Sequence, residues 1–210
     1  DIEGSIAHAT MLGRCGIIKE EEANDIVKGL KGILADIENG TLHIDMEAED
    51  IHTFIEGELT KRIGDNGKRL HTSRSRNDQV AVDIKLYLKK EVVNVKNLVV
   101  GLIKVIADKA EKYSEIVMPG YTHLQRAQPI TFGHHLLAYG EMLLRDVSRL
   151  EDCLKRMDEM PLGSCALAGT TYPIDRTITA ELLGFDRITN NSLDGVSDRD
   201  YCIEFASVLS

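Results

Sequence analysis

The feature that most constrains the fold is the stretch from residue 79 to about residue 112, which has two apolar faces. One stripe recurs every three or four residues, the period of an α-helix: Ile84, Leu88, Val92, Val95, Val99, Leu102, Ile106 and Ala110. A second stripe comprises Val82, Leu86, Val93, Val100, Ile103 and Ala107. A helix of this length spans about 50 Å, and two apolar faces require packing between other helices. A chain of 210 residues cannot easily bury it alone, so the stretch predicts a helical bundle shared between subunits.

Other segments have the same helical period, and no stretch of appreciable length has the period of a β-strand. The predicted helices cover residues 1–12, 19–38, 47–63 and 132–157, followed by a short helix between Asp175 and Gly184. Residues 191–201 resemble the approach to a third long helix. The second long helix is expected to run antiparallel to the first. The predicted fold class is therefore all-α, with a small helical N-terminal domain over residues 1–70 and the first part of a long-helix bundle over residues 71–210.

Composition excludes several classes of function. The sequence is 43% hydrophobic and 28% charged, which is typical of a helix-rich globular protein. A net charge of −9 argues against nucleic acid as a partner, and no run of 18 apolar residues predicts a membrane span. The four cysteines are scattered without a C-x-x-C pair, so we expect free thiols in a reducing compartment and no metal site. The chain starts without Met and stops inside a helical pattern, which predicts a piece of a longer protein.

A polar loop precedes the long helix and reads H-T-S-R-S-R-N-D-Q, from His71 to Gln79. Arg74 and Arg76 each offer a planar fork of donors that suits a carboxylate, and the helix start adds free N–H groups. The alternative is a helix cap with solvated charges, since Asn77 or Asp78 would cap a helix that begins at Gln79. Capping needs only one such residue, so the density of polar groups favours a site for a small anion.

Two motifs carry a resemblance to a known family. The loop H-T-S-R-S-R-N-D-Q resembles the signature loop of the argininosuccinate lyases, in the fumarase/aspartase superfamily, with Ser73 where Gly is more usual. The segment M-P-G-Y-T-H-L-Q-R-A-Q-P-I, residues 118–130, resembles their second conserved block. A later small-residue loop is also similar, with Cys165 where Gly is usual. The resemblance implies a truncated fumarase/aspartase-like bundle that forms a homotetramer with shared active sites.

The resemblance also implies an activity, the reversible elimination of fumarate from argininosuccinate to give arginine. It implies a cytoplasmic enzyme of arginine biosynthesis that acts without a cofactor. By match to the family motifs, His123 is the expected catalytic acid–base residue. The expected substrate contacts are Ser5, Arg76, Asn77 and Thr122. The alternatives without a functional role are that His123 is a hydrogen-bonded loop histidine and that Ser5 is a solvated hydroxyl.

The chain departs from the family in one large respect. It lacks the family's third block, a G-S-S-x-M-P-x-K-x-N-P loop whose Ser abstracts the substrate proton, so it carries part of an active site and is expected to be inactive alone. Two further alternatives stay open. One is another lyase of the superfamily, such as adenylosuccinate lyase, aspartase or fumarase, and the other is a crystallin-like structural protein. His8 is expected at the surface or facing a partner, and His52 in a structural role.

Overall fold

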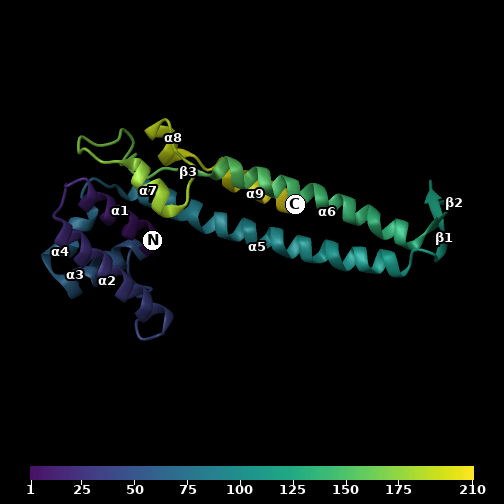
Figure 1. Ribbon diagram of the computed structural model, residues 1–210, viewed down its shortest axis with the longest axis horizontal. Coiled ribbons are helices and arrows are strands. Elements are labelled where there is room, and N and C mark those ends of the chain that lie inside the picture. The colour runs from purple at the N-terminus through teal and green to yellow at the C-terminus, as the bar shows by residue number, and fades with distance from the viewer. The chain divides into compact units, whose positions relative to one another are not determined.

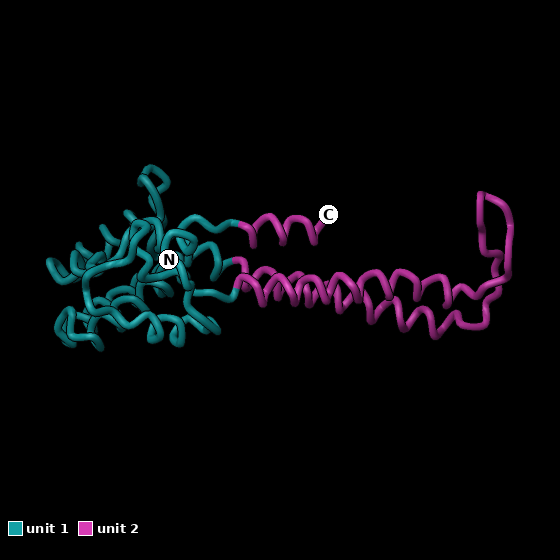
Figure 2. Tube along the Cα trace, turned by 90° about the horizontal axis from the view of Figure 1, so that it is seen from above, with its two compact units in different colours: residues 1–87, 158–199 teal, residues 88–157, 200–210 magenta.

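The computed structural model describes residues 1–210 and divides them into two compact units (Figure 2). Unit 1 comprises Asp1–Tyr87 and Asp158–Arg199, and unit 2 comprises Leu88–Met157 and Asp200–Ser210. The helix α5, Arg76–Lys112, contributes residues to both. The two units are defined by how compactly the residues of this chain pack, which is a different criterion from the predicted domains of the full-length protein. The domain boundary near residue 70 therefore stays a prediction.

Unit 1 is built from short helices around the start of α5 (Figure 1). Its helices are α1 (Ile2–Arg14), α2 (Glu20–Glu38), α3 (Ile51–Ile63), α4 (Asp65–Lys68), the 3-10 helix η1 (Arg69–His71), α7 (Arg176–Leu183) and α8 (Ser192–Ser197). Two short strands, β3 (Glu159–Met160) and β4 (Arg187–Ile188), pair in parallel. The predicted helices are thus present, although α3 begins four residues later than its periodicity suggested.

Two apolar clusters hold unit 1 together. The larger joins α1, α2, α3 and η1 through side chains that recur at the helical period: Leu12, Ile26, Leu30, Ile33, Ile55, Leu59 and Leu70 are among its buried members. The smaller packs Val82 of α5 against Met160, Leu162, Ala180 and Phe185. The second cluster fixes the first turns of α5 against residues 158–185, which places two distant parts of the sequence beside the polar loop.

Unit 2 contains the rest of α5, a hairpin, α6 (Phe132–Met157) and α9 (Asp200–Leu209). Figures 1 and 2 both show α5 and α6 side by side, and the chain reverses between them, so they run antiparallel as predicted. Close approach depends on Gly133, where an added Cβ would lie 2.4 Å from the backbone oxygen of Ala110. The bounds of α6 agree with the sequence-based prediction.

The hairpin corrects the expectation that the chain has no strands. Strand β1 (Val117–Thr122) pairs antiparallel with β2 (Gln125–Thr131), with an irregularity between Pro119 and Tyr121. Most of its side chains are exposed on both faces, so the sequence has no alternation of apolar and polar residues to signal it. The all-α fold class holds, because the strands are few and short.

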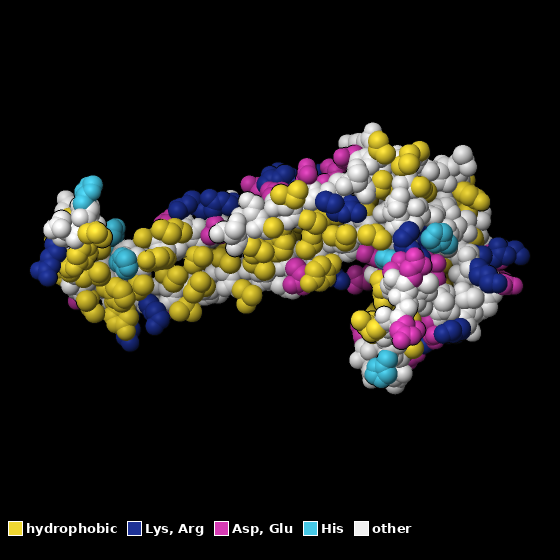
Figure 3. Space-filling model, turned by 180° about the vertical axis from the view of Figure 1, so that it is seen from behind, with side chains coloured by type: hydrophobic (Ala, Val, Ile, Leu, Met, Phe, Trp, Pro, Cys, Tyr) yellow, Lys and Arg dark blue, Asp and Glu magenta, His cyan; other side chains and the backbone are white.

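Unit 2 leaves much apolar surface uncovered. Figure 3 shows hydrophobic side chains gathered over the long helices. Exposed members in unit 2 include Leu98, Leu102, Val105, Leu137, Met142, Leu144 and Ile203. Of the predicted stripe on α5, Val92 and Ala110 are buried, whereas Leu102 is 50% exposed. None of the helices combines the length and the hydropathy needed to cross a membrane.

Candidate functional site

The polar loop, residues His71–Gln79, is closed by a capping box at the start of α5. The Ser75 hydroxyl accepts a hydrogen bond from the Asn77 backbone N–H (3.2 Å), and the Asp78 carboxylate accepts one from the Ser75 N–H (3.0 Å). These reciprocal bonds satisfy two backbone donors at the helix end. The helix therefore begins at Arg76 instead of Gln79, and Ser75 is the capping residue in place of Asn77 or Asp78.

Arg76, in the first turn of α5, is surrounded by acceptors. Its Nη1 donates to Glu56 Oε1 (3.0 Å) and Gln79 Oε1 (2.7 Å). Its Nη2 donates to Thr53 Oγ1 (3.4 Å), and Nε lies 3.4 Å from Asp50 Oδ2. The side chain is nevertheless 33% exposed. The guanidinium is thus held by residues of its own chain, while the side chain as a whole remains accessible to solvent.

Glu56, on α3, is the residue of this site that sequence reasoning missed. One oxygen, Oε1, receives three cationic or polar donors: His71 Nδ1 (3.2 Å), Arg74 Nη2 (3.5 Å) and Arg76 Nη1 (3.0 Å). Burial alone would raise the pKa of Glu56, but the His71 hydrogen bond and the arginine charges lower that pKa to about 2. Glu56 is therefore ionised at any physiological pH.

Arg74 faces the interior. Its side chain is fully buried, and burial lowers its pKa to about 10 although the Glu56 carboxylate opposes the shift. Its Nη1 donates to Ser5 Oγ (2.9 Å), and Ser5 itself is 1% exposed. The structure thus places the Ser5 hydroxyl inside the protein, engaged with Arg74. A direct contact between Ser5 and a substrate stays a prediction.

His8 lies next to this buried arginine, and its expected surface position was wrong. It is 1% exposed, and its Nε2 donates to the Thr72 carbonyl (2.9 Å). Burial, together with the charge of Arg74, lowers the pKa of His8 to about 3. The sequence missed this because a histidine within a helix carries no local signal of which neighbour it will contact.

A second loop, residues 163–170, is bonded to the polar loop. The buried Asp78 carboxylate accepts hydrogen bonds from the backbone N–H groups of Gly163 (2.9 Å) and Cys165 (2.8 Å). The Asn77 amide donates to the Ala166 carbonyl (2.9 Å). Burial raises the pKa of Asp78, which these N–H donors counteract. The site is therefore a pair of loops joined by the Asp78 carboxylate and the Asn77 amide.

The two positions where the family more often has Gly contact each other in this pair of loops. Ser73 and Cys165 both have left-handed backbones, with φ of 58° and 54°. The Cys165 thiol donates to the Ser73 carbonyl (3.4 Å), and the Ser73 hydroxyl donates to Thr170 Oγ1 (3.1 Å). Gly adopts this conformation without strain. In this chain the left-handed residues Ser73 and Cys165 each make a hydrogen bond with their side chain, which a glycine could not make.

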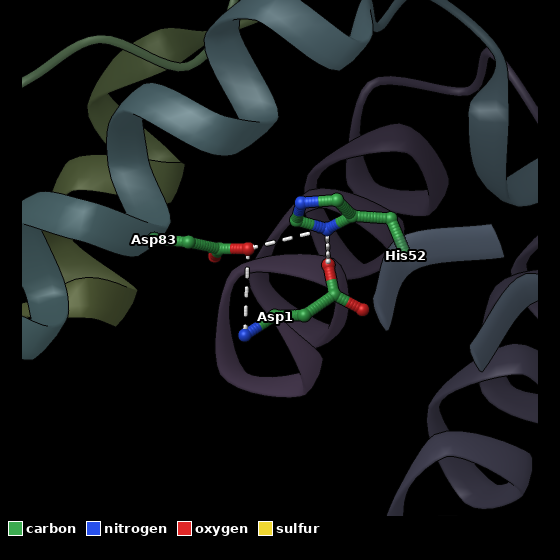
Figure 4. Close-up of side chains that lie close together, drawn as sticks. All are labelled: Asp1, His52 and Asp83. Carbon is green, nitrogen blue, oxygen red and sulfur yellow. Dashed lines mark hydrogen bonds and ion pairs between the residues drawn. The ribbon is translucent and has the colours of Figure 1, made fainter. Parts of the chain in front are cut away.

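Asp1, His52 on α3 and Asp83 on α5 form a cluster whose side chains point toward one another (Figure 4). Their ligand atoms lie within 4.8 Å of one another and could hold a metal ion. Hydrogen bonding also accounts for the arrangement, since His52 Nδ1 lies 3.0 Å from Asp1 Oδ1 and 3.4 Å from Asp83 Oδ2. Gln79 Nε2 donates to the same Asp1 oxygen (2.7 Å). The cluster ties α3 to α5, in keeping with a structural His52.

Thr122 and His123 lie together in unit 2, at the tip of the hairpin. Thr122 pairs with Gln125, so His123 and Leu124 form a two-residue turn, and both have positive φ (49° and 60°). Two left-handed residues are typical of a type I′ turn, which favours Asn and Gly. Strain of this kind is often found at functional sites. Thr122 also lines a groove between the hairpin and α6, beside Gln128 and His134.

The predicted site residues therefore fall into two groups. Arg76 and Asn77 lie together in unit 1, with Ser5 linked to them through Arg74 and Glu56. Thr122 and His123 lie together in unit 2. Each group is described within its own unit, and the roles assigned to its members stay predictions.

Comparison with known proteins places the chain in a family. A family model described as Lyase matches residues 1–210. The argininosuccinate lyases of Desulforamulus reducens and Heliobacterium mobile are each 60% identical over all 210 residues, which make up 46% of either relative. The chain thus spans about half the length of the curated relatives it matches.

Solved structures agree with the sequence matches. The crystal structure of an EDDS lyase in complex with formate superposes with a TM-score of 0.87 at 33% identity, over 99% of this chain and 40% of the other. A fumarate lyase:delta crystallin from Brucella melitensis, bound to cobalt, has the same fold at 20% identity, with a TM-score of 0.80 over 99% of this chain and 50% of the other. The family match covers every residue, and the fold agrees throughout. The chain belongs to this lyase family, with the fold of the fumarase/aspartase superfamily.

Proposed function

We propose that the full-length protein containing this chain is an argininosuccinate lyase, which cleaves argininosuccinate into arginine and fumarate. The observation that carries the proposal is the Arg76 side chain, which is 33% exposed and stands beside Asn77 in the first turn of α5. The 60% identity to argininosuccinate lyases supports this substrate over those of other superfamily lyases.

The reaction makes three chemical demands. A base removes a proton next to a carboxylate, donors stabilise the resulting negative charge, and an acid protonates the departing guanidino nitrogen. Arg76, the Asn77 amide and the Thr122 hydroxyl would bind substrate carboxylates. His123 would exchange a proton at the leaving nitrogen, because an imidazole can both donate and accept a proton. Ser5 would support the site through Arg74.

This chain would carry only part of that site. It holds no match to the family's third block, so the proton-abstracting Ser would come from elsewhere in the full-length protein. Arg76 and Asn77 lie in the first turn of α5, whereas Thr122 and His123 follow its last residue, and the 37 residues of α5 make a helix about 55 Å long. We therefore propose that each active site combines the polar loop of one subunit with the hairpin of another, in a homotetramer whose contacts cover the apolar surface of unit 2.

A fumarate-release assay tests the proposal. Full-length protein given argininosuccinate should release fumarate, detected by its ultraviolet absorbance, and should not act on adenylosuccinate, aspartate or malate. Turnover of one of these instead would identify another lyase of the superfamily. A folded protein that turns over none of them would favour a crystallin-like structural role. The 210-residue chain alone should be inactive. We place the active enzyme in the cytoplasm, in arginine biosynthesis.

A further inference from the structure

Glu56 is the one carboxylate that touches every cationic side chain of the polar loop. His71, Arg74 and Arg76 all contact its Oε1, at 3.2, 3.5 and 3.0 Å. It comes from α3, about one and a half turns beyond the α3 N-cap, Asp50, and is 26% exposed. No pattern of the sequence singles it out, and no step of the proposed reaction uses it.

The contacts of Glu56 determine where the Arg76 guanidinium lies. A long flexible side chain at a helix start has many rotamers, and ordering it costs conformational entropy. Glu56 and Gln79 accept two hydrogen bonds from Nη1, while Thr53 lies at Nη2. A charged acceptor gives a stronger hydrogen bond than a neutral one, and the Glu56 contact, at 3.0 Å, is shorter than that of the other carboxylate, Asp50, at 3.4 Å from Nε. The fork of Arg76 is therefore anchored mainly through Glu56.

We propose that Glu56 is a positioning residue, which holds the Arg76 guanidinium in the orientation that receives a substrate carboxylate. The inference rests on the proposed function and deepens it. Glu56 need not touch the substrate, because its contacts run to the arginine from the α3 side. Its charge also offsets the repulsion between Arg74 and Arg76, so that both guanidinium groups can share one loop.

The experiment compares Glu56→Gln and Glu56→Asp in the full-length protein. Gln keeps an oxygen acceptor but removes the charge, whereas Asp keeps the charge on a shorter stem. Because a substrate carboxylate is held in both the ground state and the transition state, loss of orientation should act mainly on binding. We expect Glu56→Gln to raise the KM for argininosuccinate roughly tenfold with kcat changed less than about threefold. Glu56→Asp should recover part of the loss.

A matched control comes from the same helix. Glu58 pairs with Lys61 (3.4 Å) and Arg62 (3.3 Å) and does not contact the polar loop. Glu58→Gln removes the same charge from α3 and should leave KM unchanged. An equal rise of KM in Glu58→Gln and Glu56→Gln would overturn the proposal, since it would trace the effect to net charge.

A double-mutant cycle separates positioning from a purely structural role. If Glu56 acts through Arg76, then Glu56→Gln should lower kcat/KM less than about twofold once Arg76 is already Lys. The same loss in both backgrounds would overturn the proposal. Glu56 also contacts the buried Arg74, so the melting temperature of each variant should be measured to detect any loss of stability. If Glu56→Gln does not fold, the cycle is measured with Glu56→Asp.

Fumarate binding, measured by titration calorimetry, keeps this inference separate from the proposed function. A wild-type protein that binds fumarate but does not cleave argininosuccinate would refute the proposed function alone. In that case a roughly tenfold weaker fumarate affinity in Glu56→Gln would still support the positioning role. An affinity equal to that of wild type would overturn it.

Discussion

The Arg76 side chain is partly exposed, and its guanidinium is surrounded by acceptors from Asp50, Thr53, Glu56 and Gln79. Arg76→Lys keeps the charge but removes the planar fork, so both the anchoring contacts and bidentate binding are lost. We predict a loss of kcat/KM of roughly tenfold to a thousandfold, or about 1.4–4 kcal/mol. Steady-state kinetics of the full-length protein would measure it.

The control for this substitution is another arginine near the loop. Arg69, with a side chain that is 51% exposed, pairs with Glu22 at 3.4 Å. Arg69→Lys should leave kcat/KM within about twofold of wild type, because an exposed ion pair contributes little. An Arg76→Lys enzyme as active as this control would show that Arg76 is a solvated charge outside the site.

His8 gives the protein a specific sensitivity to acid. Its pKa is about 3 when folded, against 6.5 for an unperturbed histidine. Between these values the unfolded chain binds one proton more, so stability falls as the pH drops below about 6.5. At pH 5 the loss is about 2 kcal/mol.

The variant His8→Gln isolates this effect, because Gln can still donate to the Thr72 carbonyl but does not titrate near neutral pH. The remaining titratable groups are the same in both proteins, so they contribute equally to the pH dependence of stability. Wild type should therefore lose more thermal stability than His8→Gln between pH 7 and pH 5. Parallel decreases of the two melting temperatures would contradict a buried, neutral His8.

Among the secondary-structure elements, periodicity predicted best where a helix has one clear apolar stripe. The prediction for α6 reproduces both ends, and α2 differs by one residue at its start. Helix α3 begins at Ile51 because Asp50 caps it, accepting from the Thr53 N–H at 2.6 Å. Apolar spacing determines the buried face of a helix but not its first residue. The first residue depends on the capping residue, which the apolar period does not reveal.

The candidate site was predictable only in part, for a related reason. The density of polar groups indicated an anion site at the loop that holds Arg74 and Arg76, and the resemblance indicated Ser5, Arg76, Asn77, Thr122 and His123. Glu56 could not be found in this way, since it lies 20 positions from Arg76 in the sequence and on a different helix. Hydrophobic patterns say which helix faces meet, whereas the pairing of charged side chains depends on the register of that packing.

A pair of glycines tests the packing of the long helices in unit 2. An alanine at Gly133 would place Cβ 2.4 Å from the Ala110 oxygen, which forces α6 away from α5. We predict that Gly133→Ala destabilises the fold by about 1–3 kcal/mol. Gly101, inside α5, has no atom within 4 Å of such a Cβ. There Ala should stabilise the helix by up to about 1 kcal/mol.

Thermal melting of the two full-length variants would therefore show shifts of opposite sign. A Gly133→Ala protein as stable as wild type would mean that the two helices do not approach as closely as described. Because both substitutions are the same chemical change in an α-helix, helix propensity alone cannot produce opposite signs.

For the whole molecule, the proposal of shared sites predicts complementation. Full-length Arg76→Ala and His123→Asn should each be nearly inactive. In mixed tetramers, some sites would combine the intact Arg76 of one subunit with the intact His123 of another. Co-refolding should therefore restore activity well above either parent, measured as fumarate release with mixed tetramers confirmed by mass. Confirmed mixed tetramers without recovery would place both residues of a site on one subunit.

The continuity of α5 through both units limits how the protein can change in evolution. One inserted residue rotates every later side chain by about 100° and advances it by about 1.5 Å. Such an insertion would turn the apolar stripes of the second half of α5 away from those of the first half. Seven inserted residues nearly restore the face. Viable length variants of α5 should therefore differ by about whole heptads.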